Sequence, residues 1–364
     1  MNKLYIEGVN APHVIKKELQ NLSKHIEFTK EATKAANGHV YFGVNRITDK
    51  GVVVKFYYWG GKQEFHAEPK HLAQIEADNV LKIQSAGLLD NAWAYFITPD
   101  CAKGDLDGLL QSTVLGNHGA LDYTYQVLKG LSHLHEKRFL HRDIKPANIY
   151  LDESGSAVIG DFGSVKKIPE GQEIIPASSH SLLYRPPESV KNNCYGISGD
   201  TYQAGIVLYQ LLGGALPYDG RAWLSPRDLD HYDSLPLESD QEIFVDQCIT
   251  KKIALGRVLD MSTIPPWVSS QLKRLVKKAC HVDPKLRFQS TSAFMAKIHE
   301  IRAATLDWQI IDGQPTLRAK TSYRIIEKSG KLRVEKRRGE DWRNDNTFAG
   351  ATLKDLVEEV SRRA

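Results

Sequence analysis

Two short stretches carry polar residues whose types and spacing suit phosphate chemistry. The stretch HRDIKPANIYLD contains Asp143, Lys145 and Asn148, and the stretch IGDFGS contains Asp161. The carboxylate of Asp143 can accept a hydroxyl proton, the ammonium of Lys145 can neutralise phosphate charge, and the amide oxygen of Asn148 suits Mg²⁺. Asp161 follows the apolar run AVI and supplies a carboxylate for metal ions. A loop whose polar residues merely cap turns does not account for this spacing.

With this set of residues the chain resembles a eukaryotic-type protein kinase. The motif residues that carry the resemblance are His141, Arg142, Asp143, Lys145, Asn148, Asp161, Phe162 and Gly163. Lys145, within DIKPAN, is the residue typical of the serine/threonine type. The resemblance covers residues 28–304. It implies an α+β, bilobal fold, with a small strand-rich N-lobe and a large helical C-lobe.

The resemblance also implies an activity, which is transfer of the γ-phosphoryl group of ATP to Ser or Thr hydroxyls. Asp143 and Lys145 would be the catalytic residues, and Asn148 and Asp161 would hold Mg²⁺. A full activation segment, from Asp161 to the Glu of LLYRPPE, favours a protein substrate over a small molecule. A small-molecule kinase of related fold remains an alternative.

The nucleotide site is expected mainly in the N-lobe and at the hinge between the lobes. The resemblance places these residues there: Gly38, Val40, Val53, Lys55, Glu68, Thr98, Pro99, Cys101, Asp105 and Tyr150. Thr98 stands at the gatekeeper position, and the backbone of residues 99–101 would bind adenine. Asp105 would bind the ribose or cap a helix, or do both. The favoured interpretation of Cys101 is a hinge residue whose side chain has no special chemistry.

Lys55 stands on a predicted strand, within VVVK, where its ammonium would contact the α- and β-phosphates. The alternative is a lysine that extends its charge from a sheet edge to solvent. Glu68 is the expected ion-pair partner of Lys55. Because Pro69 disfavours helical geometry in the residue before it, the helix is expected to start or kink there, and Glu64 is the second candidate.

The phosphate-binding loop departs from the family pattern. Its three glycine positions correspond to Thr33, Ala35 and Gly38, so two of the three glycines are replaced. Side chains limit how closely a backbone approaches phosphate, although Asn37 can adopt positive φ. These departures raise the alternative of a pseudokinase that acts as a scaffold. The presence of Lys55 and all the catalytic charges favours an active enzyme.

Further residues match landmarks of the family's scaffold and regulation. Glu188 is expected to form a buried ion pair with Arg287, and Asp200 is expected to anchor the backbone of the catalytic loop. Ser181 is expected to bond Asp143 and Lys145. The Arg142 position suggests control by phosphorylation, and the candidate acceptors are Ser164, Ser178 and Ser179.

Composition places the chain among globular proteins. It has 364 residues, a hydrophobic content of 41%, a formal charge of +4 and four cysteines without metal-ligand spacing. The cysteines are expected to be free thiols in a reducing compartment. No apolar run is long enough for a membrane span, and the start of the chain lacks the apolar segment of a signal peptide. The sequence therefore predicts a cytoplasmic protein without membrane contact.

Periodicity and breaks suggest four regions. They are an N-terminal helical extension (1–27), the N-lobe (28–98), the hinge and C-lobe (99–304) and a basic appendage (305–364). The appendage is predicted as a small ββα module, a hairpin followed by the helix TLKDLVEEV.

Within the appendage, residues 315–343 carry ten Lys or Arg against four Asp or Glu, a net charge of +6. A solvated hairpin face is the favoured interpretation. Docking to a macromolecular partner comes second, and nucleic acid is the least favoured.

Overall fold

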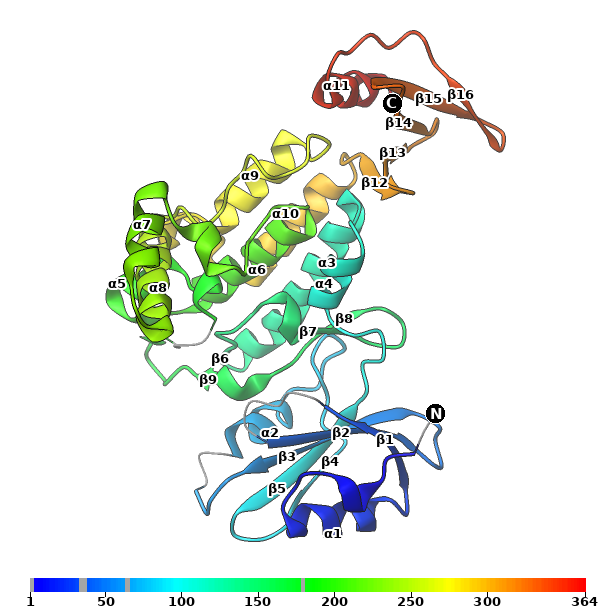
Figure 1. The fold of residues 1–364 in the computed structure, drawn as a ribbon. Coiled ribbons are helices and arrows are strands. Elements are labelled where there is room, and N and C mark those ends of the chain that lie inside the picture. Colours follow the sequence, from blue (N-terminus) through cyan, green and yellow to red (C-terminus); the bar gives the residue numbers. More distant parts are fainter. Residues whose placement is uncertain (1–2, 33–37, 63–65, 178–180) are drawn as a thin grey trace.

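The structure is a computed structural model that describes residues 3–32, 38–62, 66–177 and 181–364. Figure 1 shows a strand-rich lobe, a larger helical lobe and a separate sheet at the C-terminal end. The predicted bilobal α+β fold is therefore confirmed. Among the helices of the described ranges, none is long and apolar enough to cross a membrane.

The N-lobe is built on a five-stranded antiparallel sheet of order β1-β2-β3-β5-β4. The strands are β1 (Ile26–Glu31), β2 (Gly38–Asn45), β3 (Gly51–Tyr58), β4 (Ser85–Leu88) and β5 (Trp93–Pro99). Alternation along β3 buries Val52, Val54 and Phe56 on one face. A turn that contains Asp49 and Lys50 joins β2 and β3 into an antiparallel hairpin.

Two helices belong to the N-lobe. The first, α1 (His13–Leu22), buries Ile15 and Leu19 in the same apolar core as the face of β3. The N-terminal segment is thus packed on the sheet. The second, α2 (Ala67–Leu72), has Pro69 as its third residue. Proline is tolerated there, because backbone nitrogens in the first turn of a helix make no intrahelical hydrogen bond. Residues 63–65, which come shortly before α2 in the chain, lie outside the described ranges.

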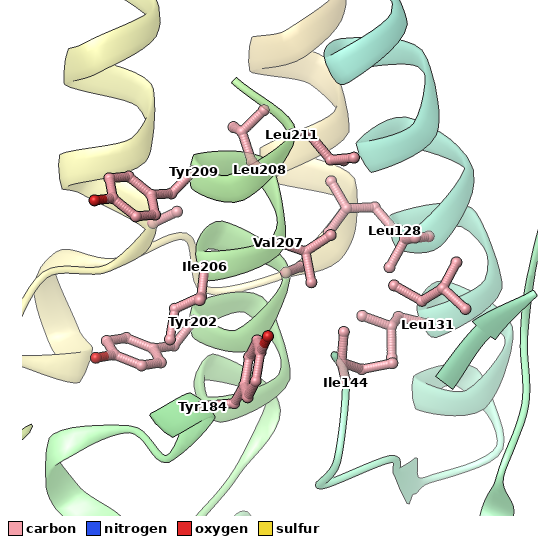
Figure 2. Close-up of a cluster of buried hydrophobic side chains, with 14 of the residues drawn as sticks. Leu128, Leu131, Ile144, Tyr184, Tyr202, Ile206, Val207, Leu208, Tyr209 and Leu211 are labelled. Atoms are coloured by element: carbon pink, nitrogen blue, oxygen red, sulfur yellow. The ribbon is translucent and has the colours of Figure 1, made fainter. Parts of the chain in front are cut away.

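The C-lobe is mainly helical. Its helices are α3 (Leu106–Ser112), α4 (Asn117–Glu136), α5 (Pro187–Asn192), α6 (Ile197–Leu211), α7 (Pro226–Ser234), α8 (Glu238–Ala254), α9 (Ser270–Ala279) and α10 (Thr291–Arg302). The helix α6 is buried along most of its length, from Gly199 to Leu211. Figure 2 shows Val207 and Leu211 of α6 pointing toward Leu128 of α4, so the two helices share one apolar core.

Short strands near the lobe boundary shape the loops that carry the polar motifs. They are β6 (Phe139–Leu140), β7 (Ile149–Leu151), β8 (Ala157–Ile159), β9 (Lys166–Lys167), β10 (Ile175–Pro176) and β11 (Cys194–Tyr195). The pair β7 and β8 is antiparallel, so the ends of the two motif loops are held next to each other.

The C-terminal appendage is larger than the predicted ββα module. It is a meander of five antiparallel strands followed by one helix: β12 (Asp307–Ile311), β13 (Gln314–Arg318), β14 (Tyr323–Lys328), β15 (Lys331–Arg338), β16 (Asp341–Asn344) and α11 (Leu353–Arg363). The expected hairpin and helix are present, but three strands were missed.

The physical reason for the missed strands lies in turns and charge. Asp312 and Gly313 both have positive φ and reverse the chain between β12 and β13, as Ser329 and Gly330 do between β14 and β15. The predicted hairpin did not allow for the break at 319–322 between β13 and β14, and the edge strand β16 carries few apolar residues. Periodicity alone therefore gave too few strands.

Candidate active site

The catalytic-loop motif lies between β6 and β7, where a 3₁₀ turn at Pro146–Asn148 fixes its shape. The Nδ2 atom of Asn148 donates hydrogen bonds to the backbone oxygen of Asp143 at 2.8 Å and to its Oδ2 at 3.0 Å. Lys145 Nζ lies 3.2 Å from the same Oδ2 and donates to Ser181 Oγ at 2.7 Å. The structure thus brings together all four of these residues.

Asp143 presents one carboxylate oxygen without a partner. The residue is 4% exposed, and its Oδ1 atom makes no hydrogen bond within the described part of the chain. An unpaired, buried carboxylate oxygen is costly unless a ligand supplies a donor. The arrangement therefore leaves Oδ1 available to a hydroxyl group, while Lys145 and Asn148 hold Oδ2.

Asp200 on α6 anchors the backbone that precedes Asp143. Its carboxylate accepts hydrogen bonds from the amides of His141 at 3.0 Å and Arg142 at 2.9 Å. His135 Nε2 lies 2.8 Å from it, and the Tyr195 hydroxyl donates to it at 2.8 Å. Burial by itself raises the pKa of Asp200, but these hydrogen bonds outweigh burial and lower it. The anchor is therefore a charged, fully bonded carboxylate.

Three residues of this anchor were not found from the sequence. They are His135, Tyr195 and Gln203; the last accepts a hydrogen bond from the Ile144 amide at 2.9 Å. Gln203 lies three residues after Asp200 on α6 and thus on the same side of the helix. That spacing could have identified Gln203 from the sequence. His135 lies 65 residues before Asp200, on α4, and Tyr195 lies five residues before it, on β11; neither position gave a signal in the sequence.

His141 connects the two motifs. Its Nε2 atom lies 3.0 Å from the Gly160 oxygen, and its ring meets Phe162 edge to face at 5.3 Å. Burial lowers the pKa of His141, against the opposing effect of nearby carboxylates. A neutral ring suits these contacts, because Nε2 donates to Gly160 while Nδ1 accepts from the Asp143 amide.

Asp161 follows β8 with a left-handed backbone, at φ 55°. Asn148 and Asp161 fit a divalent cation in their chemistry. The amide nitrogen of Asn148 is used by Asp143, which leaves its oxygen as the remaining donor. A carboxylate and an amide oxygen are ligands that hard cations prefer.

Lys55 and Glu68 form the expected ion pair. Lys55 Nζ lies 2.8 Å and 2.9 Å from the two Glu68 oxygens. Burial raises the pKa of Glu68, and the Lys55 ammonium opposes that rise. The alternative partner, Glu64, lies outside the described residues, as do Thr33, Ala35 and Asn37 of the phosphate loop.

The remaining predicted nucleotide residues line the sheet and the hinge. Gly38 and Val40 lie on β2, and Val40 pairs with Lys55. Val53 pairs with Thr98, which is buried, and Pro99 ends β5.

Cys101 and Asp105 lie beyond the sheet. Burial, reinforced by nearby Asp100 and Asp152, raises the pKa of the Cys101 thiol to about 11, so the thiol is neutral. Asp105 caps α3, since its Oδ1 accepts a hydrogen bond from the Gly108 amide at 2.8 Å. The helix-cap interpretation of Asp105 is therefore realised in the structure.

Tyr150 lies close to the second motif. A Cβ atom built on Gly160 would be 2.5 Å from the Tyr150 ring, so a glycine is required before Asp161. The Tyr150 backbone forms a bridge with Asp105. The ring thus packs against the backbone just before Asp161.

The end of the activation segment is tied to the C-lobe by the expected ion pair. Arg287 donates to both Glu188 oxygens, at 2.8 Å and 2.7 Å. Of the candidate phosphate acceptors, Ser164 is 9% exposed and thus poorly accessible here. Ser178 and Ser179 lie outside the described residues.

Comparison with known proteins agrees with this geometry. Residues 33–298 match the family model described as protein kinase domain. The chain belongs to the protein kinase family. Kinases of this family use ATP together with a divalent metal, and they act on protein hydroxyl groups.

Relatives of this kinase domain differ in type. A putative L-type lectin-domain containing receptor kinase of Arabidopsis thaliana is 31% identical over 222 residues, which is 57% of this chain and 32% of the relative. Serine/threonine-protein kinase Nek5 of Mus musculus is 28% identical over 260 residues, 70% of this chain and 37% of the relative. A tyrosine-protein kinase receptor of Caenorhabditis elegans, svh-2, is 28% identical over 191 residues, 50% of this chain and 18% of the relative. The chain thus spans little more than a third of these relatives at most.

Proposed function

We propose that this protein is an active serine/threonine kinase that transfers the γ-phosphoryl group of ATP to a protein. The observation that carries the proposal is that Oδ1 of Asp143 has no partner among the described residues, while Lys145 and Asn148 hold the carboxylate through Oδ2. Asp143 orients the substrate hydroxyl and accepts its proton, and Lys145 stabilises the charge on the transferred group. Ser/Thr specificity rests on Lys145 in the motif DIKPAN.

Asn148 and Asp161 would hold the divalent cation, which we propose to be Mg²⁺. When bound, it neutralises the phosphate charge that develops during transfer. Lys55, fixed by Glu68, orients the α- and β-phosphates. Backbone groups of the hinge bind adenine, as proposed for Pro99 and Cys101.

The remaining pocket roles are also part of the proposal. Gly38 covers the phosphates, and Val40, Val53 and Tyr150 pack on the adenine ring. Thr98 controls the depth of the pocket. Asp105 bonds the ribose through the oxygen that the α3 cap leaves free, since the Gly108 amide uses only Oδ1.

The second candidate is a pseudokinase that acts as a scaffold through its basic appendage. It is favoured by the two replaced loop glycines, Thr33 and Ala35. Against it, the charged groups that phosphoryl transfer needs are present and positioned. A cytoplasmic location is part of the main proposal, because all four cysteines are free.

Incubation with Mg-ATP, followed by intact mass measurement and phosphosite mapping, tests the proposal. The control is Asp161→Ala, which removes the proposed metal carboxylate. Phosphate should be added to the wild type alone, on Ser or Thr, including sites in residues 164–181. Phosphotyrosine would refute the specificity. No added phosphate, together with no thermal shift by ATP, would favour the scaffold.

A further inference from the structure

The two faces of the C-terminal sheet have opposite characters. One face is covered by α11, and the apolar cluster between them contains Trp308, Leu317, Tyr323, Ile325, Val334, Leu356, Val357 and Val360. Because side chains alternate along a strand, the residues between these positions lie on the other face, which we call the outer face. Figure 1 shows α11 on one side of the sheet.

The outer face is strongly basic. Strand register places six cations and two carboxylates, Asp307 and Glu335, on it; the cations are Arg318, Arg324, Lys328, Lys331, Arg333 and Arg337. All of them except Arg324 are exposed. Much of the net charge of residues 315–343 is therefore concentrated on one side of the sheet.

Most of this charge is not compensated inside the molecule. Glu335 pairs with Arg324 at 2.5 Å. Across the described ranges, no carboxylate lies within ion-pair distance of Lys328, Lys331 or Arg333. Lys328 also stands directly opposite Lys331 in the β14–β15 ladder, an arrangement of like charges that destabilises a sheet. A polyanion bound across the strands would relieve this repulsion.

An aromatic ring lies within the basic face. Trp342 on β16 is half-buried, and the Arg324 guanidinium lies 4.7 Å from the centre of its ring. It stands opposite Arg337 in the register. Aromatic rings among cations are what single-stranded nucleic acid uses, because bases stack on rings while cations follow the phosphates. An acidic polypeptide would use the cations but needs no ring.

We propose that the outer face binds single-stranded nucleic acid without base specificity. The sequence had ranked this possibility last, because charges that alternate with Leu332 and Val334 are what a solvated hairpin face shows. The structure favours nucleic-acid binding more strongly than the sequence does, because β13 to β16 present the cations side by side on one surface. The proposal does not depend on catalytic activity, so it stands or falls separately from the kinase assignment.

The test is fluorescence anisotropy of the full-length protein with labelled oligo(dT) and oligo(U) of about 16 nucleotides. If all six cations contact phosphate, the logarithm of the affinity should fall against the logarithm of salt concentration with a slope of about −4. Joint Lys328→Ala, Lys331→Ala and Arg333→Ala substitution should reduce that slope by about 2. Trp342→Ala should weaken binding about 5- to 150-fold, and Trp342→Phe much less.

The matched control removes three exposed cations elsewhere, by Arg274→Ala, Lys277→Ala and Lys354→Ala. It should leave the affinity unchanged, and circular dichroism should be the same for all variants. Stronger binding of oligo(U) or of oligo(dT) would identify the natural strand. No binding at about 50 mM salt would overturn the proposal. So would equal loss in the control, or a poly-glutamate peptide that binds as tightly as the oligonucleotides.

Discussion

The two oxygens of Asp143 have different surroundings, and this difference supports the role that we propose for the residue. Oδ2 receives Asn148 Nδ2 and lies beside Lys145, whereas Oδ1 has no partner in the described part of the protein. The backbone before it is fixed by Asp200, so the carboxylate cannot turn freely. A general base needs this combination of a fixed position and a free lone pair.

Replacement of Asp143 by Asn tests this assignment. The amide keeps the size of the side chain but cannot take a proton, so the rate of phosphate transfer should fall by about 10² to 10⁴. ATP binding, followed by thermal shift, should be largely retained, because the nucleotide is expected to contact other residues. A Ser156→Ala variant on the nearby β-turn is a control and should keep full activity. Unchanged transfer in Asp143→Asn would contradict the assignment.

His141 makes the stability of the folded protein depend on pH. Burial lowers its pKa below the ordinary value of about 6.5, so the unfolded chain takes up a proton that the folded protein resists. This contribution to stability is complete above about pH 6.5 and is lost as pH falls toward the lowered pKa.

Urea unfolding measured between about pH 7 and pH 5 checks this expectation. The free energy of unfolding of the wild type should fall by up to about 1.4 kcal/mol per pH unit from this residue. In His141→Asn the slope should be smaller, although the variant is less stable at every pH. An identical slope in both proteins would show that other groups cause the acid sensitivity.

At the scale of elements, Glu188 and Arg287 join α5 to the segment before α10, across 99 residues of sequence. The Arg287 side chain is fully buried and also donates to the His281 and Ser198 backbone oxygens. An ion pair of this kind contributes little net stability as a pair, because both charges lose water. Removal of only one of the two charged groups leaves the other one buried without its partner.

Glu188→Ala should therefore destabilise the protein by about 3–5 kcal/mol, measured by urea unfolding. Replacing both residues by Met should restore part of the loss, since no unpaired charge then remains. The exposed pair of Arg221 and Asp233 is a useful comparison, and Asp233→Ala should cost about 1 kcal/mol or less. Equal costs for the two Ala variants would refute the argument from burial.

At the scale of the molecule, the N-terminal segment and the C-terminal sheet are both joined to the kinase lobes. Leu19 of α1 is 0% exposed in the N-lobe core. At the other end, Asn117 of α4 donates to the backbone oxygens of Trp267 and Leu306, and Trp267 packs on both the C-lobe core and the sheet. Both terminal regions are therefore integral to the folded structure.

Leu19→Ala should cost about 2–5 kcal/mol, because it removes packed methyl groups from a fully buried position in the N-lobe core. Leu88→Ala in the same lobe is the matched control, since Leu88 is 65% exposed, and it should stay within about 0.5 kcal/mol. Thermal unfolding followed by circular dichroism measures both. A Leu19→Ala protein as stable as the control would mean that α1 is not part of the N-lobe core.

The chain by itself determined the identities that carry the chemistry. Asp143, Lys145, Asn148 and Asp161 lie in short motifs, and local spacing is sufficient to recognise them. The resemblance predicted long-range pairs as well, such as Glu188 with Arg287. Helices with strong apolar stripes were also predictable, because their periodicity is a local property.

Only the tertiary structure decided which atoms meet. It left Oδ1 of Asp143 without a partner among the described residues and brought His135 to Asp200. It also turned an expected hairpin into a five-stranded sheet with one basic face. These outcomes depend on packing between segments far apart in the chain, and no local pattern of residues encodes such contacts.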